Sequence, residues 1–157
     1  MAPGEVVIQS MWPPVVAAVR SKGIACKFQP LKEGYRSGGG GIGLSSGLKG
    51  VAPDAACEYI NWYLSGWVGG FLMRRGYYSA VPETAKLFLS ADERGYWFQG
   101  KPAAGDITNP HGQVMEHAGV ARDGGSFVER MGKVACWNSV MDENQYRVRK
   151  WNEFIAA

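Results

Sequence analysis

The sequence predicts a helix-rich α/β fold, and three observations support this prediction. Two segments rich in β-branched and apolar residues, 5–11 and 25–31, lie on either side of a predicted helix at 15–22, as in an α/β layer. A longer helix is predicted over 53–75, because acidic residues lie at its start, basic residues at its end and apolar residues recur at helical spacing between them. The 157 residues, 46% hydrophobic and 20% charged, are typical of one globular domain, so a single domain over 1–157 is expected.

The two parts of the chain differ in predicted content. Residues 1–50 are expected to form the strand–helix–strand unit and then a glycine-rich loop at 34–50, which encloses one short strand at 42–45. Residues 51–157 are expected to be mostly helical. After the long helix, further helices are predicted at 82–90, 92–98 and 126–137 and after Asp142, with irregular surface at 101–125.

Several aromatic and sulfur-containing side chains are expected in the interior. Trp62, Tyr63 and Trp67 belong to a face of the long predicted helix and are predicted to be core residues. The three cysteines are far apart in the sequence: Cys26, Cys57 and Cys136. Because the chain has no Cys-x-x-Cys motif and no Cys/His cluster, we interpret them as buried free thiols.

Composition and charge argue against several classes of function. The 17 Lys and Arg residues are scattered and the formal net charge is +3, which argues against a nucleic-acid partner. No apolar run approaches the ~18 residues of a membrane-spanning helix, so membrane insertion is not expected. No metal-ligand spacing is present in the sequence, and neither a metal nor a cofactor is expected.

Two motifs formally match enzyme signatures. Residues 38–43 (GGGGIG) match the dinucleotide fingerprint, but no predicted helix follows them, so we interpret them as a run of glycines. Residues 43–47 (GLSSG) match the nucleophile elbow of hydrolases, and Asp106 and His111 follow in the required order. The elbow also requires a helix after the nucleophile. A small serine hydrolase that uses Ser45 is therefore a minor alternative, and we expect the chain not to be an enzyme.

Four segments in order resemble one family of binding proteins. They are VVIQSMWPP, KEGYRSGGGGIGLSSGLKG, DAACEYINWYLSGWVGGFLMRRGYYSAVPETAK and the C-terminal ACWNSVMDENQYRVRKWNEFIAA. In order and spacing they resemble the C-terminal half of the polyamine-type (spermidine/putrescine) periplasmic solute-binding proteins of ABC transporters. The resemblance implies the C-terminal portion of a two-lobed α/β fold, which closes over a small ligand without catalysis.

The resemblance also implies a ligand site. Family members surround an alkylammonium with aromatic side chains and bind its amino groups with carboxylates. Carried over to this sequence, the expected ligand residues are Trp12, Tyr77 and Asn138. The family's wall tryptophan and amine-binding aspartate fall on Gly38 and Gly40, so affinity for a cation is expected to be weakened.

The resulting expectation is a fragment or descendant of a solute-binding protein that binds a small polyamine-like cation weakly. The alternative is a structural protein that associates with itself through the former cleft surface and binds no ligand. A homo-oligomer is expected in either case, because strands of a partial sheet would have open edges. The family docks on an ABC permease, but this chain is not expected to do so. The family is periplasmic; this sequence shows no signal peptide, so a complete gene product of this sequence would be cytoplasmic.

Overall fold

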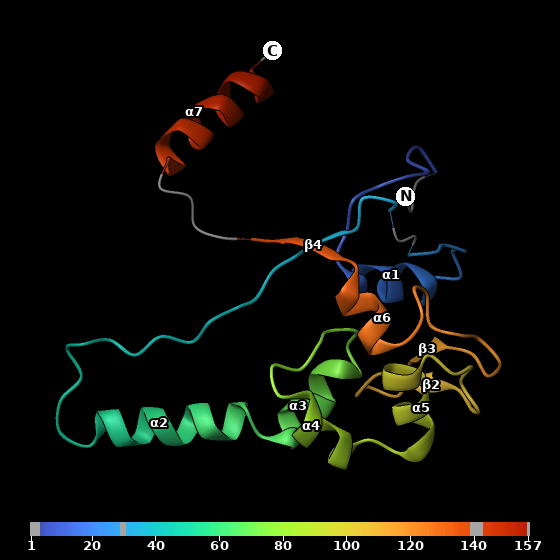
Figure 1. Cartoon of the computed structure of the whole chain (residues 1–157), viewed down its shortest axis with the longest axis horizontal. Coiled ribbons are helices and arrows are strands. Elements are labelled where there is room, and N and C mark those ends of the chain that lie inside the picture. Colours follow the sequence, from blue (N-terminus) through green and yellow to red (C-terminus); the bar gives the residue numbers. More distant parts are fainter. Residues whose placement is uncertain (1–3, 29–30, 139–142, 157) are drawn as a thin grey trace.

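The protein is an α/β protein of helices and a few short strands (Figure 1). Its structure, a computed structural model, describes residues 4–28, 31–138 and 143–156. The first elements are α1 (Pro13–Arg20), β1 (Tyr35–Ser37), α2 (Ala52–Tyr63) and α3 (Gly66–Met73). Next come α4 (Pro82–Ala85), the 3₁₀ turn η1 (Lys86–Phe88), α5 (Ala91–Gln99), β2 (Ile107–Thr108) and β3 (Val114–Glu116). The last are α6 (Phe127–Gly132), β4 (Val134–Trp137) and α7 (Asn144–Ile155).

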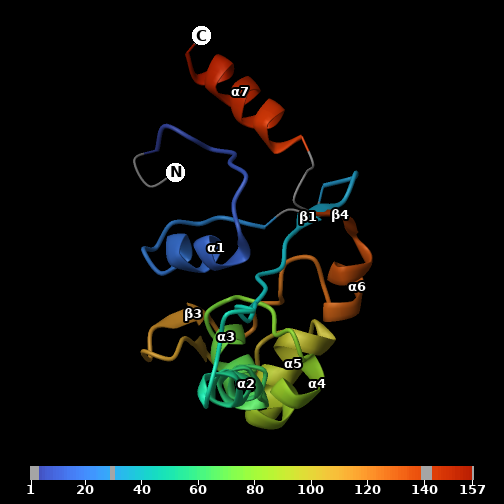
Figure 2. The same ribbon diagram turned by 90° about the vertical axis from the view of Figure 1, so that its left-hand side faces the viewer.

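The hydrophobic core lies in the middle of the chain. Helices α3, α4 and α5 gather beside the β2–β3 hairpin in the lower part of Figure 1. One cluster of buried side chains joins them: Met73, Ala85, Leu89, Tyr96, Trp97, Ala103, Ile107 and Met115. Helix α1 lies above this core and to one side of the β1–β4 pair in both ribbon views (Figure 2). The core is therefore assembled from residues after position 65, and α1 packs onto it from outside.

The glycines of α3 allow its close packing against α4. A Cβ atom at Gly66 would overlap the carbonyl oxygen of Thr84, and one at Gly69 would lie 2.8 Å from the Cβ of Ala85. Both positions are buried. Glycine lowers the intrinsic helix propensity of α3, but here it removes the side chain that would hold the two helices apart.

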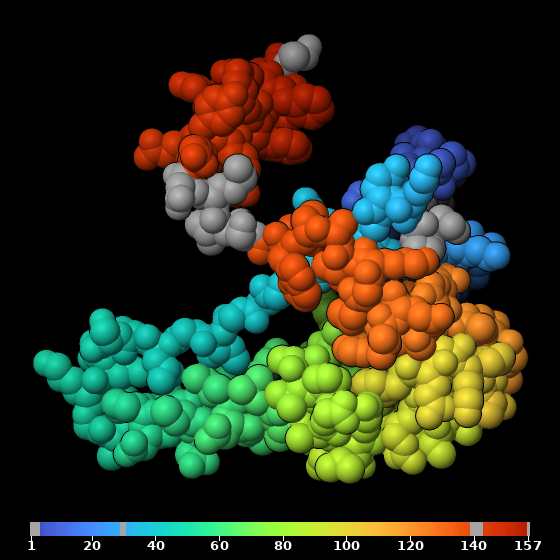
Figure 3. All heavy atoms as spheres, viewed as in Figure 1, coloured from blue at the N-terminus to red at the C-terminus, as the bar shows by residue number. Residues whose placement is uncertain are grey.

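The long predicted helix at 53–75 is wrong, because the structure divides it into α2 and α3. The break lies at Ser65, whose extended backbone (ψ 156°) makes it the N-cap of α3. No residue of α2 is buried, and Trp62 and Trp67 are each about half exposed, so the core assignment of these tryptophans is also wrong. Tyr63 is partly buried. Helix α2 extends away from the core, as Figure 3 shows in teal, and only α3 packs into the core.

The predicted strands at 5–11 and 42–45 are absent, and no strand includes the described residues of 25–31. Val7 and Ile8 are more than four-fifths exposed, because no neighbouring strand pairs with them. Strands instead form where a partner exists. β1 pairs in parallel with β4, and β4 lies in the stretch 126–137 that was predicted to be helical. β2 pairs antiparallel with β3, and both lie in the stretch 101–125 that was predicted to be irregular.

Two helix starts contain complete capping boxes. The Ser126 hydroxyl accepts from the Glu129 amide and the Glu129 carboxylate accepts from the Ser126 amide, which confirms the predicted start of α6. The Ser90–Glu93 pair does the same at α5. Helix α6 ends at Gly132 rather than near 137, because the chain then enters β4. Asp142, the predicted start of the last helix, lies outside the described residues.

Two arginines, Arg122 and Arg130, are buried beside the core. Arg122 is 7% exposed, and its guanidinium lies over the rings of Trp97 (4.6 Å) and Tyr78 (5.1 Å). Within the described residues it has no carboxylate partner. Burial therefore lowers the pKa of Arg122 to about 10. Cation–π contacts contribute about 1–2 kcal/mol each, whereas burying an unpaired ion costs several kcal/mol.

The C-terminal helix α7 stands apart from the core. All described residues from 143 to 156 are exposed, and Figures 1 and 3 show the helix separated from the rest of the molecule. Its apolar residues are therefore left uncovered: Val148, Trp151, Phe154 and Ile155. Helix α7 is amphipathic, as predicted, but the structure covers its apolar face with nothing from the described residues.

The cysteines are less buried than the sequence predicted. All three thiols are free; Cys26 is partly buried, but Cys57 and Cys136 are exposed, so their predicted burial is wrong. Across the described ranges, no helix is both long enough and apolar enough to cross a bilayer.

Candidate ligand-binding surface

Trp12 lies at the start of α1, directly before Pro13. Its backbone is extended (ψ 150°), so it is the N-cap of the helix, and Pro13 fixes the first helical position. The indole is 46% exposed. Trp12 is therefore held by a rigid helix start but remains accessible to a ligand.

Asn138 is brought to Trp12 by the β1–β4 pair. The register aligns Ser37 with Trp137, and the Asn138 amide donates to the Ser37 carbonyl at 2.7 Å. The residue directly after β1 is Gly38. A Cβ atom there would lie 3.0 Å from Nδ2 of Asn138 and 3.4 Å from Cη2 of Trp12. Three segments that are remote in sequence thus meet at Gly38.

Tyr77 is connected to the same helix start through its neighbour Gly76. Gly76 has a positive φ of 87°, and a Cβ atom there would lie 3.2 Å from Cα of Pro14. The Tyr77 amide donates to the Leu72 carbonyl at 3.1 Å, and its ring is 49% exposed. The first turn of α1 therefore lies beside the backbone that carries Tyr77.

The charge of this surface differs from that of a site for cations. The guanidinium carbon of Arg36 lies 5.9 Å from the centre of the Trp12 ring, where a ligand ammonium would otherwise make its cation–π contact. At Gly40, the position of the family's aspartate, a Cβ atom would have no neighbour within 4 Å. The structure thus has the aromatic and amide groups of the predicted site but places a positive charge beside them.

Sequence reasoning missed Arg36. Its only signal is its position in the alternation of β1, where Arg36 is exposed between two partly buried neighbours. Pairing with β4 was not predicted, so nothing in the sequence indicated which side chain Arg36 would face.

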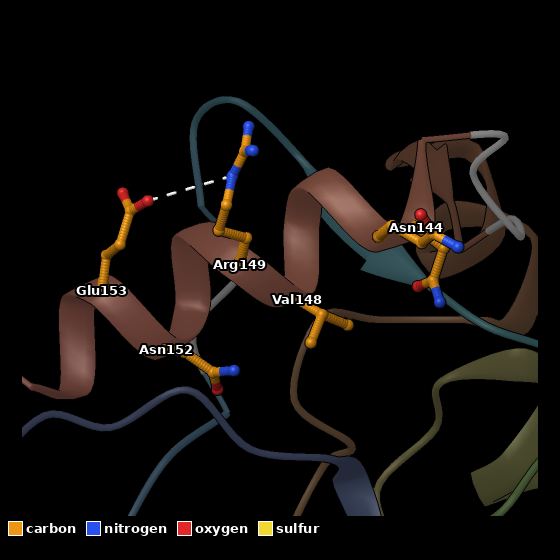
Figure 4. Close-up of a pocket in the computed structure, with 6 residues that line it drawn as sticks. Asn144, Val148, Arg149, Asn152 and Glu153 are labelled. Atoms are coloured by element: carbon orange, nitrogen blue, oxygen red, sulfur yellow. Dashed lines mark ion pairs between the residues drawn. The ribbon is translucent and has the colours of Figure 1, made fainter.

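A separate hollow of about 440 Å³ runs along α7 (Figure 4). All the residues that line it belong to this one helix: Asn144, Gln145, Val148, Arg149, Asn152 and Glu153. Arg149 and Glu153, two of these residues, form an ion pair (3.9 Å) along the helix. A single helix face cannot enclose a small ligand, so this hollow is an open surface rather than a binding cleft.

The three residues of the hydrolase alternative are not assembled. The Ser45 hydroxyl accepts from the Gly47 amide at 3.3 Å, within its own turn. Asp106 accepts from the Ala118 amide and lies 3.5 Å from Nδ1 of His117 rather than beside His111. The loop that carries Ser45 runs towards the free end of α2, and the β2–β3 hairpin lies on the opposite side of the molecule (Figure 1).

In the described ranges, no group of three or more His, Cys, Asp or Glu side chains comes together as metal ligands would.

Comparisons with protein-family models, with curated proteins and with solved structures found no match to this chain.

Proposed function

We propose that this chain is a non-enzymatic binding protein, related to the C-terminal half of the polyamine-type solute-binding proteins. It takes a small ligand on the surface formed by Trp12, Tyr77 and Asn138. The observation that carries the proposal is the meeting of Trp12 and Asn138 at Gly38, since these residues come from opposite ends of the chain. An aromatic face beside an amide suits a small organic ligand with a polar end.

The proposed ligand is a small alkylammonium, bound weakly. Trp12 and Tyr77 offer aromatic faces for the cation, while Arg36 competes for the Trp12 face. The missing element is a carboxylate for the ammonium group. Restoring that carboxylate should therefore increase affinity, whereas adding a negative charge elsewhere in the same loop should not.

Gly40→Asp tests this reasoning directly, with Gly39→Asp as its matched control. Neither position has a neighbour within 4 Å of an added Cβ atom, and neither has a positive φ, so both variants should fold. A charge-assisted hydrogen bond to the ammonium should tighten putrescine or spermidine binding about tenfold in Gly40→Asp. Isothermal titration calorimetry on both variants checks this; equal affinities in the two would contradict the proposed site.

Trp12→Ala removes the aromatic wall without touching the core. We expect at least a tenfold loss of amine affinity, with little change in the unfolding temperature measured without ligand. If Gly40→Asp binds spermidine equally well with and without Trp12, the ligand does not use this surface.

Self-association is the second candidate function, and a different observation favours it. Helices α2 and α7 have no buried residue among those described and expose tryptophans: Trp62 (51%) and Trp151 (61%). The parallel β1–β4 pair also stands alone, although parallel sheets are normally covered on both faces. A second copy that covered these surfaces would remove the exposed apolar area.

Light scattering after size-exclusion chromatography distinguishes the two candidates. Trp151→Ser should reduce an oligomer to smaller species and leave amine affinity unchanged, because Trp151 lies on α7, away from Trp12. Trp12→Ala should lower the amine affinity and leave the oligomer intact. A clean monomer of the unmodified chain at high concentration would contradict self-association.

A further inference from the structure

A small, partly open space lies next to the core, and two of its lining residues, Pro13 and Gly76, are the chain neighbours of Trp12 and Tyr77. Its volume is about 50 Å³, and α1, α5, β3 and α6 all contribute to its lining. One buried water needs about 10–15 Å³, so the cavity has room for a small polyatomic ligand. The polar groups on its wall therefore indicate what it would hold.

The cavity wall carries two arginines whose positive charges are not neutralised. Arg122 donates to the Trp97 carbonyl at 2.9 Å, and Arg130 donates to the Tyr78 hydroxyl at 2.6 Å and to the Asp123 carbonyl. No carboxylate of the described residues lies within ion-pair distance of either guanidinium. Most of their N–H donors thus have no acceptor in the described part of the chain.

The two carboxylates on the cavity wall already have a partner. Arg20, on α1, forms ion pairs with both Glu116 and Asp123, the second at 2.5 Å. Asp123 also accepts from the Phe28 amide at 2.7 Å. With three arginines and two carboxylates, the cluster is left with one positive charge in excess.

A further donor at the cavity is unsatisfied. Trp97 lines the space and is 4% exposed, yet its indole Nε1 has no hydrogen-bond partner among the residues that the structure describes. An indole N–H can only donate, and so can a guanidinium. Whatever fills the cavity must therefore accept hydrogen bonds, and a negative charge on it would balance the excess.

We propose that this cavity binds a small oxyanion, a free carboxylate or phosphate ion, between Arg122, Arg130 and the Trp97 indole. The planar guanidinium fork matches two oxygens of one such anion. Buried water would satisfy the donors but would leave the arginine charges unbalanced. This site takes an anion, whereas the Trp12 surface is proposed to take a cation, so the two proposals are tested by different ligands.

Thermal unfolding of the full chain in sodium acetate, phosphate or chloride, at pH 7 and constant ionic strength, tests the site. We expect Tm to rise with the logarithm of acetate or phosphate concentration above Kd, relative to chloride, by on the order of 5 °C at a hundred times Kd. Calorimetric titration with the same two anions should give one site per chain. Curves that do not differ between the oxyanions and chloride would overturn the proposal.

Two variants locate the binding. Arg122→Met should abolish the oxyanion response while raising Tm in chloride, because an uncompensated buried charge is removed. Trp97→Phe keeps an aromatic ring beneath Arg122 and removes only the indole donor, so Kd should rise about tenfold. Arg149→Met, on exposed α7, changes the net charge equally and should bind as the unmodified chain does. An oxyanion response that survives in Arg122→Met, or an unchanged Kd in Trp97→Phe, overturns the assignment; the phenylalanine variant decides if Arg122→Met does not fold.

Discussion

Helices α5 and α7 have similar composition but different environments. Both combine aromatic with charged residues, yet α5 buries Tyr96 and Trp97 whereas no residue of α7 is buried. Helix α5 begins with a complete capping box and is tied to α3 by the Arg74–Glu93 ion pair. Helix α7 has no side-chain cap. Aromatic content therefore does not place a helix in the core; connections to neighbouring elements do.

The largest expected effect on the free energy of unfolding comes from the glycines that let α3 pack closely against α4. Gly66→Ala would force a methyl group against the Thr84 carbonyl, which belongs to the backbone and cannot rotate away. We expect a loss of about 3 kcal/mol in the free energy of unfolding. Gly132→Ala, in α6 with nothing within 4 Å, should change it by less than about 0.5 kcal/mol. Chemical denaturation measures both, and equal losses would contradict the close α3–α4 packing.

A smaller effect is expected from the ion pair that ties α5 to α3. Glu93 accepts from Arg74 at 2.5 and 2.9 Å and from the Ser90 amide at 2.8 Å. Burial opposes the charged carboxylate, but these hydrogen bonds outweigh it and lower the pKa of Glu93. Glu93→Gln should cost about 2 kcal/mol at pH 7. Glu83→Gln, whose carboxylate is 77% exposed beside Lys86, should cost less than about 0.5 kcal/mol.

The sign of the acid dependence follows from that lowered pKa. Because the folded pKa of Glu93 lies below that of an unperturbed glutamate, the contribution of Glu93 to stability is complete above the unfolded pKa and is lost as pH falls through the folded pKa. Denaturation at pH 7 and at stepwise lower pH should show a shallower acid loss in Glu93→Gln than in the unmodified chain. Parallel losses would show that Glu93 is not part of the acid response.

The smallest expected effect comes from α2, which is exposed as α7 is. Trp62→Ser in α2 should change the free energy of unfolding by about 0.5 kcal/mol or less at low protein concentration, because α2 buries nothing. If self-association covers α2, the effect should grow with concentration, since subunit binding then contributes to stability. A large loss even in dilute solution would mean that α2 packs against the same chain.

The sequence predicted helices better than it predicted strands or burial. Capping boxes and flanking proline are local signals; they located the start of α6 correctly and that of α1 to within two residues, since α1 is Pro13–Arg20 rather than 15–22. Strand formation at Tyr35 depends on a partner about a hundred residues away, which no local pattern contains. The same apolar periodicity occurs in a buried helix and in one without a partner, so the exposure of Trp62 and Trp67 could not be derived from it.

The candidate site was predictable only through the resemblance. Trp12, Tyr77 and Asn138 share no local motif, and only the β1–β4 register and the close contact at Gly76 bring them to one helix start. Arg36 beside Trp12 and the arginines beside Trp97 depend on packing between remote segments, which the scattered basic residues of the sequence did not indicate.

The pairing of Tyr35 with Val134 makes nearly the whole core a single loop closed by two short strands. Closing so long a loop is entropically costly and is rewarded only by a few backbone hydrogen bonds. Contacts of this sequence separation form slowly, so the core should fold before the two strands meet. Since Asn138 reaches Trp12 through this pairing, the proposed ligand surface would be completed in the last step of folding, and a ligand bound there would hold the two ends of the chain together.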